Sequence, residues 1–156
     1  LSLICAASLS GCYGGTGDAA AASPQSELPR SEAGLKQVLL SIRTSDATHA
    51  FIVEVAATGA EQAQGLMFRT RLAPDKGMIF PFAVDRVASF WMKNTVIPLD
   101  IIFIRRDGTI ESIAANTIPY SLAPVRSNEP VATVLEIAAG RAAELGIGPG
   151  DTVTWQ

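Results

Sequence analysis

Cysteine and histidine are both scarce in this chain. The only cysteines, Cys5 and Cys12, lie within the first dozen of 156 residues, and His49 is the only histidine. Residues 13–156 therefore cannot form a disulfide or a cysteine-based zinc site. No Gly-x-Ser-x-Gly elbow occurs, and we expect His49 to be an exposed residue at a strand edge rather than a catalytic base.

Positive charge and long apolar runs are also lacking. The chain has 12 basic and 15 acidic residues, for a net charge of −3. This balance gives no basic face for a nucleic-acid partner. No apolar run reaches the roughly 18–20 residues of a membrane span. The 48% hydrophobic content nevertheless supports a packed core, and the length suits one domain.

The first twelve residues are apolar, and no charge occurs before Asp18. They resemble a signal peptide whose basic start is truncated, and Leu9-Ser10-Gly11-Cys12 resembles the lipobox of bacterial lipoproteins. This resemblance implies export to the bacterial cell envelope or periplasm, with membrane association only through lipid on Cys12. The alternative is a plain secretory signal that is cleaved within residues 19–22, which would leave Cys12 incidental.

Residues 13–34 are rich in Gly, Ala, Ser and Pro and lack apolar periodicity, which predicts a flexible tether. We expect a single β-domain over residues 35–156. Alternating apolar residues predict strands near 38–42 and 51–55. Thr58 and Glu61 have the spacing of a capping box, so a short helix should run from there to about residue 66.

The second half of the domain also consists mainly of predicted strands. Short apolar segments at 78–80 and 87–92 are separated by Pro81, and a buried strand is expected over 99–105. Asp107-Gly108 predicts a hairpin turn. A long loop is expected over residues 116–130, followed by a strand over 131–138, a short helix near 140–145 and a last strand over 152–155. Seven or eight strands with two short helices predict a compact antiparallel sandwich or barrel.

Several motifs resemble the DUF192 family, also catalogued as UPF0127, over about residues 50–155. They are Gly65-Leu66-Met67-Phe68-Arg69, Gly77-Met78-Ile79-Phe80, the stretch from Phe90 to Phe103, Asp107-Gly108-Thr109-Ile110, and Val134-Leu135-Glu136-Ile137 with Gly140. The resemblance implies a small, mainly β domain of sandwich or jelly-roll type in an often exported prokaryotic family. It supplies no catalytic residues.

The stretch from Phe90 to Asp100 mixes aromatic, cationic, amide, hydroxyl and carboxylate side chains within eleven residues. Apolar walls with a few polar groups are typical of a small-molecule or glycan site. We therefore expect a non-catalytic binding module without a cofactor. The candidate ligand-binding residues are Arg69, Trp91, Lys93, Asn94, Thr95, Asp100, Arg126 and Glu136. A competing interpretation places Trp91 in the core and makes Asn94-Thr95 a turn with Asn94 in the left-handed region.

Two further hypotheses remain open. Asp100 and Glu136 both lie between aliphatic residues, which raises a carboxyl pKa and suits a general acid. If both point the same way, they could form the acid–base pair of a hydrolase. Alternatively, Met67, Met78 and Met92 could bind Cu(I), because thioethers are soft ligands. The competing roles are ion pairing or amide capping for the carboxylates, and core packing for the methionines.

Overall fold

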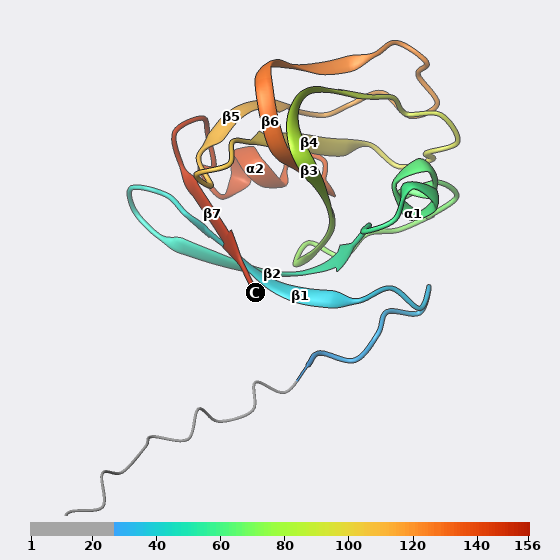
Figure 1. Cartoon of the computed structure of the whole chain (residues 1–156), viewed down its shortest axis with the longest axis horizontal. Helices are drawn as coiled ribbons and strands as arrows, with labels where there is room; N and C mark the ends of the chain where they lie inside the picture. The colour runs from blue at the N-terminus through green and yellow to red at the C-terminus, as the bar shows by residue number, and fades with distance from the viewer. Residues whose placement is uncertain (1–26) are drawn as a thin grey trace, which may run out of the picture.

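The computed structural model describes residues 27–156 (Figure 1). The predicted signal segment, the predicted lipidation site at Cys12 and most of the predicted tether lie outside the described residues. The described end of the tether, residues 27–34, contains a turn in which the Gly34 amide donates to the Ser31 carbonyl at 2.8 Å.

Seven strands form one curled sheet in the order β5-β4-β6-β3-β2-β1-β7 (Figure 1). The elements are β1 (Gln37–Arg43), β2 (Thr48–Val55), α1 (Gly59–Gln64), β3 (Lys76–Phe90), β4 (Leu99–Ile104), β5 (Ile110–Ala114), β6 (Val125–Ala138), α2 (Arg141–Glu144) and β7 (Thr152–Trp155). The predicted mainly β class with two short helices is confirmed. Neither α1 nor α2, the helices of the described part, has the length and apolarity to cross a membrane.

The curl brings the two edges of the sheet together at one end. The Ile110 amide donates to the Asp151 carbonyl at 2.8 Å, and the Val153 amide donates to the Gly108 carbonyl at 2.8 Å. A Cβ at Gly108 would lie 2.7 Å from the Val153 carbonyl oxygen. The hairpin turn between β4 and β5 therefore needs glycine to approach β7 this closely.

The strand pairings are antiparallel with one exception. β1 and β2 form a hairpin, and β4 and β5 pair across the predicted turn at Asp107-Gly108. β2 and β3 instead pair in parallel. The connection between them, residues 56–75, carries α1 and is long enough for a crossover, so the expectation of antiparallel pairing was wrong for this pair.

Two prolines lie inside strands, although Pro81 was expected to end one strand and Pro130 to precede another. Pro81 lies within β3 and Pro130 within β6, and the two strands pair along most of their length. The register shifts between Pro81 and Arg86 and again after Val87. Such irregularities tolerate a residue without an amide donor, so both strands continue and the predicted loop over 116–130 is shorter than expected.

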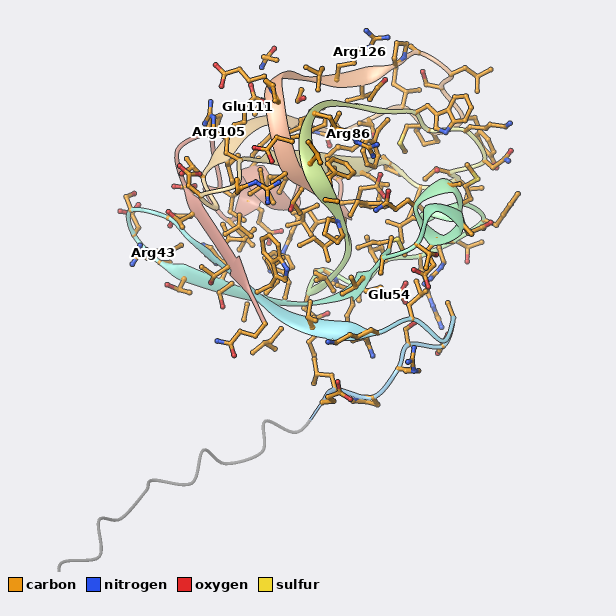
Figure 2. All side chains as sticks on the ribbon, in the orientation of Figure 1. Arg43, Glu54, Arg86, Arg105, Glu111 and Arg126 are labelled. Carbon is orange, nitrogen blue, oxygen red and sulfur yellow. The ribbon has the colours of Figure 1, made fainter. Side chains whose placement is uncertain are left out.

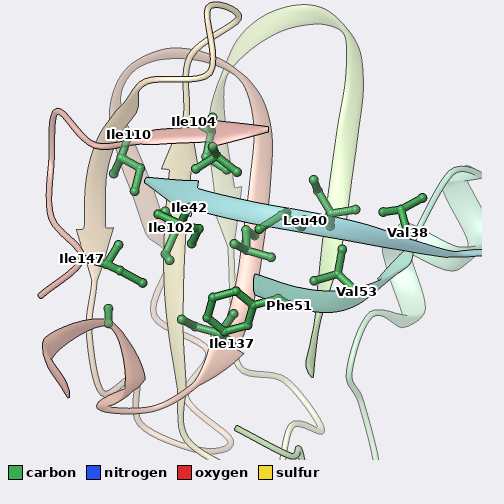
Figure 3. Close-up of a cluster of buried hydrophobic side chains, with 14 residues drawn as sticks. Val38, Leu40, Ile42, Phe51, Val53, Ile102, Ile104, Ile110, Ile137 and Ile147 are labelled. Carbon is green, nitrogen blue, oxygen red and sulfur yellow. The ribbon is translucent and has the colours of Figure 1, made fainter. Parts of the chain in front are cut away.

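The sheet is covered on both faces by apolar side chains. One cluster draws residues from all seven strands and from Ala142 of α2 (Figure 3). A second cluster lies on the other face of β3, β4 and β6 and includes Met78, Phe80, Met92 and Ile101. Every residue of β4 is buried as a result. The second cluster forms the floor of the candidate site.

The capping box predicted at the start of α1 is present. The Thr58 hydroxyl accepts from the Glu61 amide at 3.2 Å, and the Glu61 carboxylate accepts from the Thr58 amide at 2.8 Å. The α-helix ends at Gln64 rather than near residue 66, because Gly65 takes a φ of +49°. The cap fixes where the helix begins, and it thereby positions residues 62–67 at the candidate site.

Candidate functional site

Three segments that are far apart in the sequence meet beside the end of β3. The Phe68 amide donates to the Asn94 carbonyl at 2.9 Å, and the Tyr120 amide donates to the Thr95 carbonyl at 3.1 Å. The Met92 amide donates to the Ser121 carbonyl at 2.9 Å. Backbone hydrogen bonds with Phe68 on one side and with residues 120–121 on the other thus hold residues 91–95 in place.

The same bonds coincide with unusual backbone conformations. Phe68, Asn94 and Tyr120 have φ values of +64°, +56° and +62°. This left-handed region is accessible to asparagine but strained for bulky aromatic residues. The competing prediction, that Asn94 is a turn residue in the left-handed region, is therefore confirmed. Strain of this kind is concentrated at functional sites in many proteins.

A partly enclosed cleft of about 350 Å³ lies between residues 62–67, the second cluster and the end of β3. Four aromatic side chains line it: Phe80, Phe82, Phe90 and Trp91. The rings of Phe80 and Phe90 meet edge to face with centroids 5.1 Å apart. Trp91 is 50% exposed and is therefore not the core residue of the competing interpretation.

Gly65 allows the segment after α1 to lie against the aromatic wall. A Cβ at this position would be 3.5 Å from Cζ of Phe80. Its φ of +49° and ψ of −136° form a combination that only glycine adopts without strain. A Cβ at 3.5 Å would make only an ordinary contact with Phe80, so the backbone conformation rather than a lack of space requires glycine here.

Glu136 contributes a carboxyl group to the cleft from the centre of the sheet. It pairs with Met78 of β3 and Ile101 of β4, so its side chain emerges on the same face as the second cluster. Glu136 is only 5% exposed, and its carboxyl group makes no hydrogen bond within residues 27–156, although its oxygens are open to the cleft rather than fully enclosed. Burial raises the pKa of Glu136 to about 8, so the group is mostly neutral at pH 7.

Asp100 is also buried, but its carboxylate accepts hydrogen bonds from backbone amides. It pairs with Ile137, so its side chain emerges on the opposite face of the sheet from Glu136. Its Oδ1 accepts from the amides of Asn116 at 2.9 Å and Gly140 at 3.1 Å, and its Oδ2 accepts from the Ala142 amide at 3.0 Å. Asp100 therefore ties the chain after β5 to the start of α2.

The predicted acid–base pair required both carboxyl groups to point the same way. Because Asp100 and Glu136 emerge on opposite faces, they cannot act on one substrate atom. Glu136 is the only acidic residue among those that line the cleft. The cleft therefore contains one neutral carboxyl group and no second acidic group that could act with it on a substrate.

The predicted cationic residues are not gathered at the cleft. Arg69 forms an ion pair with Glu54, with Nη2 and Oε2 2.7 Å apart. Lys93 is exposed, and its ammonium lies 5.1 Å from the Trp91 ring centroid. Arg126 projects from the outer part of β6 at the periphery (Figure 2). Of the eight predicted site residues, Trp91, Thr95 and Glu136 line the cleft, whereas Arg69, Lys93, Asn94, Asp100 and Arg126 do not.

The methionines of the copper hypothesis are distributed between core and cleft. Met78 and Met92 are fully buried, and the Met92 sulfur accepts from the Thr117 hydroxyl at 3.2 Å. The Met67 sulfur accepts from the side-chain Nδ2 of Asn94 at 3.8 Å. Two of the three sulfurs are thus hydrogen-bonded, and residues 27–156 contain no group of three His, Cys, Asp or Glu residues arranged to hold a metal.

His49 differs from the expectation of an exposed strand-edge residue. It is half-buried on β2, where it pairs with Ile42 of β1, and its Nε2 is buried without a hydrogen-bond partner among the described residues. The strand-edge position is as expected, because the pairing of β2 with β3 begins only at Ile52; the burial of the ring is what the sequence did not indicate. His49 is not among the residues that line the cleft.

Two polar residues of the cleft were missed by sequence reasoning. The Gln62 amide nitrogen donates to the carbonyls of Ala56 at 3.2 Å and Pro81 at 3.0 Å, which joins α1 to β3. The Arg86 guanidinium stacks on the Phe82 ring at 3.9 Å at the exposed side of the cleft. The capping box could have indicated Gln62, because it places this residue on the first turns of α1.

The fold and the cleft define a small β-protein with one curled sheet and an aromatic hollow on its outer face. The sequence matches the family model DUF192, described as "Uncharacterized ACR, COG1430", over residues 40–155, and the chain belongs to this family. Among curated proteins the sequence has no match.

Two solved structures resemble the chain along most of its length. A protein of unknown function from Novosphingobium aromaticivorans DSM 12444 is 47% identical, with a TM-score of 0.80, and the match covers 91% of this chain and 100% of that one. A Sinorhizobium meliloti 1021 protein, provisionally described as a transcription regulator, is 43% identical, with a TM-score of 0.76. That match covers 78% of this chain and 95% of the other.

Proposed function

We propose that this protein is a non-catalytic binding module that takes a small ligand into the cleft between residues 62–67 and the end of β3. The observation that carries the proposal is Glu136, a buried carboxyl group that faces an aromatic-lined cleft and lacks any hydrogen-bond partner within residues 27–156. Its oxygens are not among the fully buried atoms that lack a partner, so they are open to the cleft, and a ligand bound there can supply the missing hydrogen bond.

The composition of the cleft supports the same conclusion. Binding sites for small molecules are concave and mainly apolar, with a few polar groups that fix orientation. Here the aromatic rings of Phe80, Phe82, Phe90 and Trp91 provide the apolar walls, and Gln62, Thr95 and Glu136 provide polar groups. The volume of about 350 Å³ lies at the lower end of the range for such sites.

A catalytic role is less well supported. A general acid with a raised pKa needs a second group that acts on the same substrate, and Asp100 emerges on the other face of the sheet. A role in transcription regulation, as in the description of the Sinorhizobium protein, is also not proposed, because a net charge of −3 does not favour binding to a polyanion.

The proposal places the module in the bacterial cell envelope, anchored through lipid on Cys12. This part rests on the lipobox-like Leu9-Ser10-Gly11-Cys12 alone. An inhibitor of lipoprotein signal peptidase should cause an uncleaved precursor to accumulate. Unchanged processing would refute the lipid anchor without affecting the cleft.

The cleft can be tested with a matched pair of tryptophan variants. Ser89 lines the cleft and is exposed, so Ser89→Trp should fill its mouth without disturbing the core. Val84→Trp adds the same indole at an exposed position that does not line the cleft. The full chain would be screened by ligand-observed NMR against neutral and charged fragments, including sugars and aromatic amines. We expect fragments that bind the wild type and Val84→Trp but not Ser89→Trp; equal binding to both variants, or no binding to the wild type, would contradict the proposal.

A further inference from the structure

We propose that the ligand carries an ammonium group, which docks against the Glu136 carboxyl group inside the aromatic walls of the cleft. This inference rests on the proposed binding function and specifies the chemistry of the ligand. It follows from what the inner part of the cleft offers to a ligand: the Glu136 carboxyl group, the acceptor oxygens of Gln62 and Thr95, and a cluster of aromatic rings.

Besides Glu136, the two less exposed polar side chains of the cleft, those of Gln62 and Thr95, have already used donors. Exposed side chains keep donors at its rim, namely those of Gln64, Arg86 and Ser89. Both contacts of the Gln62 amide nitrogen are to backbone carbonyls, which leaves its Oε1 as an acceptor. The Thr95 hydroxyl donates to the Lys93 carbonyl at 3.3 Å, so its lone pairs remain available. A ligand group that only donates is therefore complementary to the inner part of the lining, and an ammonium group has three donors and no acceptor.

The aromatic walls favour the same group. Cations bind to the faces of aromatic rings, and the attraction increases when water is excluded. The protein itself uses this interaction twice at the rim, with Arg86 over Phe82 and Lys93 near Trp91. The half-buried ring of Phe90 has no such cation from the described part of the chain and remains available to a ligand, whereas Phe80 is only 1% exposed.

No cation of the described chain occupies the position beside Glu136. Its neighbours across the sheet, Met78 and Ile101, are apolar. Glu54 lies on the same row of the sheet one strand beyond Met78, roughly 10 Å away, and it is paired with Arg69. The charged groups on the surrounding elements are the exposed Arg86 and Lys93, the Glu54–Arg69 pair, and Glu61, which caps α1.

Docking of an ammonium group changes the protonation of Glu136. The O–H bond of the neutral carboxyl breaks, its proton passes to the buffer, and the carboxylate then faces the ligand cation. Since burial holds the pKa of Glu136 at about 8, binding at pH 7 should release most of one proton. Affinity for the cation should also rise about tenfold between pH 6 and pH 7 and level off above pH 8.

The experiment uses isothermal titration of the full chain with benzylammonium chloride and with benzyl alcohol as a neutral probe of similar size. Titrations in two buffers of different ionisation enthalpy count the protons released. We expect at least tenfold tighter binding of benzylammonium at pH 8, proton release at pH 7, and the loss of both in Glu136→Gln. Because glutamine resembles the protonated acid in shape and charge, this variant should keep its fold.

Two results would overturn the ammonium inference. One is equal affinity for the two probes; the other is benzylammonium binding without proton release. If both probes bind the wild type and neither binds Ser89→Trp, the cleft remains the binding site and only the ligand class is wrong. If Ser89→Trp binds both probes as the wild type does, the proposed function fails as well.

Discussion

Asp100 and Glu136 lie on neighbouring strands, β4 and β6, and their side chains emerge from opposite faces of the sheet. Asp100 pairs with Ile137 and Glu136 pairs with Ile101, so the two acids are offset by one residue in the register. Side chains alternate between faces along a strand, so this offset places the two carboxyl groups on opposite faces of the sheet. One acid holds the backbone together, and the other faces the cleft.

The structural role of Asp100 predicts a large loss of stability when its carboxylate is altered. Asp100→Asn replaces an acceptor of buried amide donors with a donor, which leaves at least one amide unsatisfied. We expect the free energy of unfolding to fall by about 3 kcal/mol, measured by urea denaturation. Asp85→Asn removes an exposed carboxylate paired with Arg106 and should change stability by less than about 1 kcal/mol. A similar small effect at Asp100 would contradict its role.

The raised pKa of Glu136 predicts that stability depends on pH. Below the ordinary value of 4.5, the group is protonated in the folded and unfolded states, and its contribution is fully present. As the pH rises from 4.5 to about 8, the unfolded state ionises while the folded state keeps its proton, so stability declines. The decline should approach roughly 1.4 kcal/mol per pH unit and end above pH 8.

Glu136→Gln isolates this dependence from that of other groups. The variant cannot ionise, so the difference in unfolding free energy between variant and wild type should grow between pH 5 and pH 8. Urea denaturation at pH 5, 6.5 and 8 measures it. Parallel pH profiles for the two proteins would mean that Glu136 is well solvated.

Trp91 and Met92 are sequence neighbours with opposite environments. Trp91 is half exposed and lines the cleft, whereas Met92 is 1% exposed in the second cluster. Trp91→Ala should therefore lower stability by less than about 1 kcal/mol but weaken binding of aromatic fragments. Met92→Ala should lower stability by about 2–5 kcal/mol. Thermal denaturation and fragment titration separate the two effects, and a reversed order would show that the assignment of faces is wrong.

The left-handed conformation of Asn94 predicts a specific order among substitutions. Asn94→Gly should be nearly neutral, because glycine adopts a φ of +56° without strain. Asn94→Ala should lower the free energy of unfolding by about 1 kcal/mol, since other residues with a Cβ are strained there. Denaturant unfolding checks the order. If alanine is tolerated as well as glycine, the turn does not depend on the left-handed conformation.

Much of the fold could be predicted from local patterns. The alternation of Val38, Leu40 and Ile42, the capping box and the Asp107-Gly108 turn each depend on residues within a few positions, and each is present. The parallel pairing of β2 with β3 could not be predicted in this way. It depends on how the long connection crosses the sheet, which no local pattern records.

The site shows the same division between local and long-range information. The stretch around Trp91 and Thr95 could be identified as a candidate because its mixture of side chains is unusual. Which of its residues face the cleft depends on hydrogen bonds from residues 68 and 120–121. The sequence contexts Leu-Asp-Ile and Leu-Glu-Ile are nearly identical, and only the register between β4 and β6 assigns Asp100 and Glu136 to different faces.

The most direct test follows the side-chain carboxyl carbon of Glu136 by ¹³C NMR, assigned with the Glu136→Gln variant, while pH and then a cleft-binding fragment are varied. The structure predicts a titration midpoint near 8 in the free protein and a displaced signal when the fragment binds. A midpoint near 4.5 that no bound fragment alters would contradict the central claim that Glu136 is the buried recognition group of a ligand cleft.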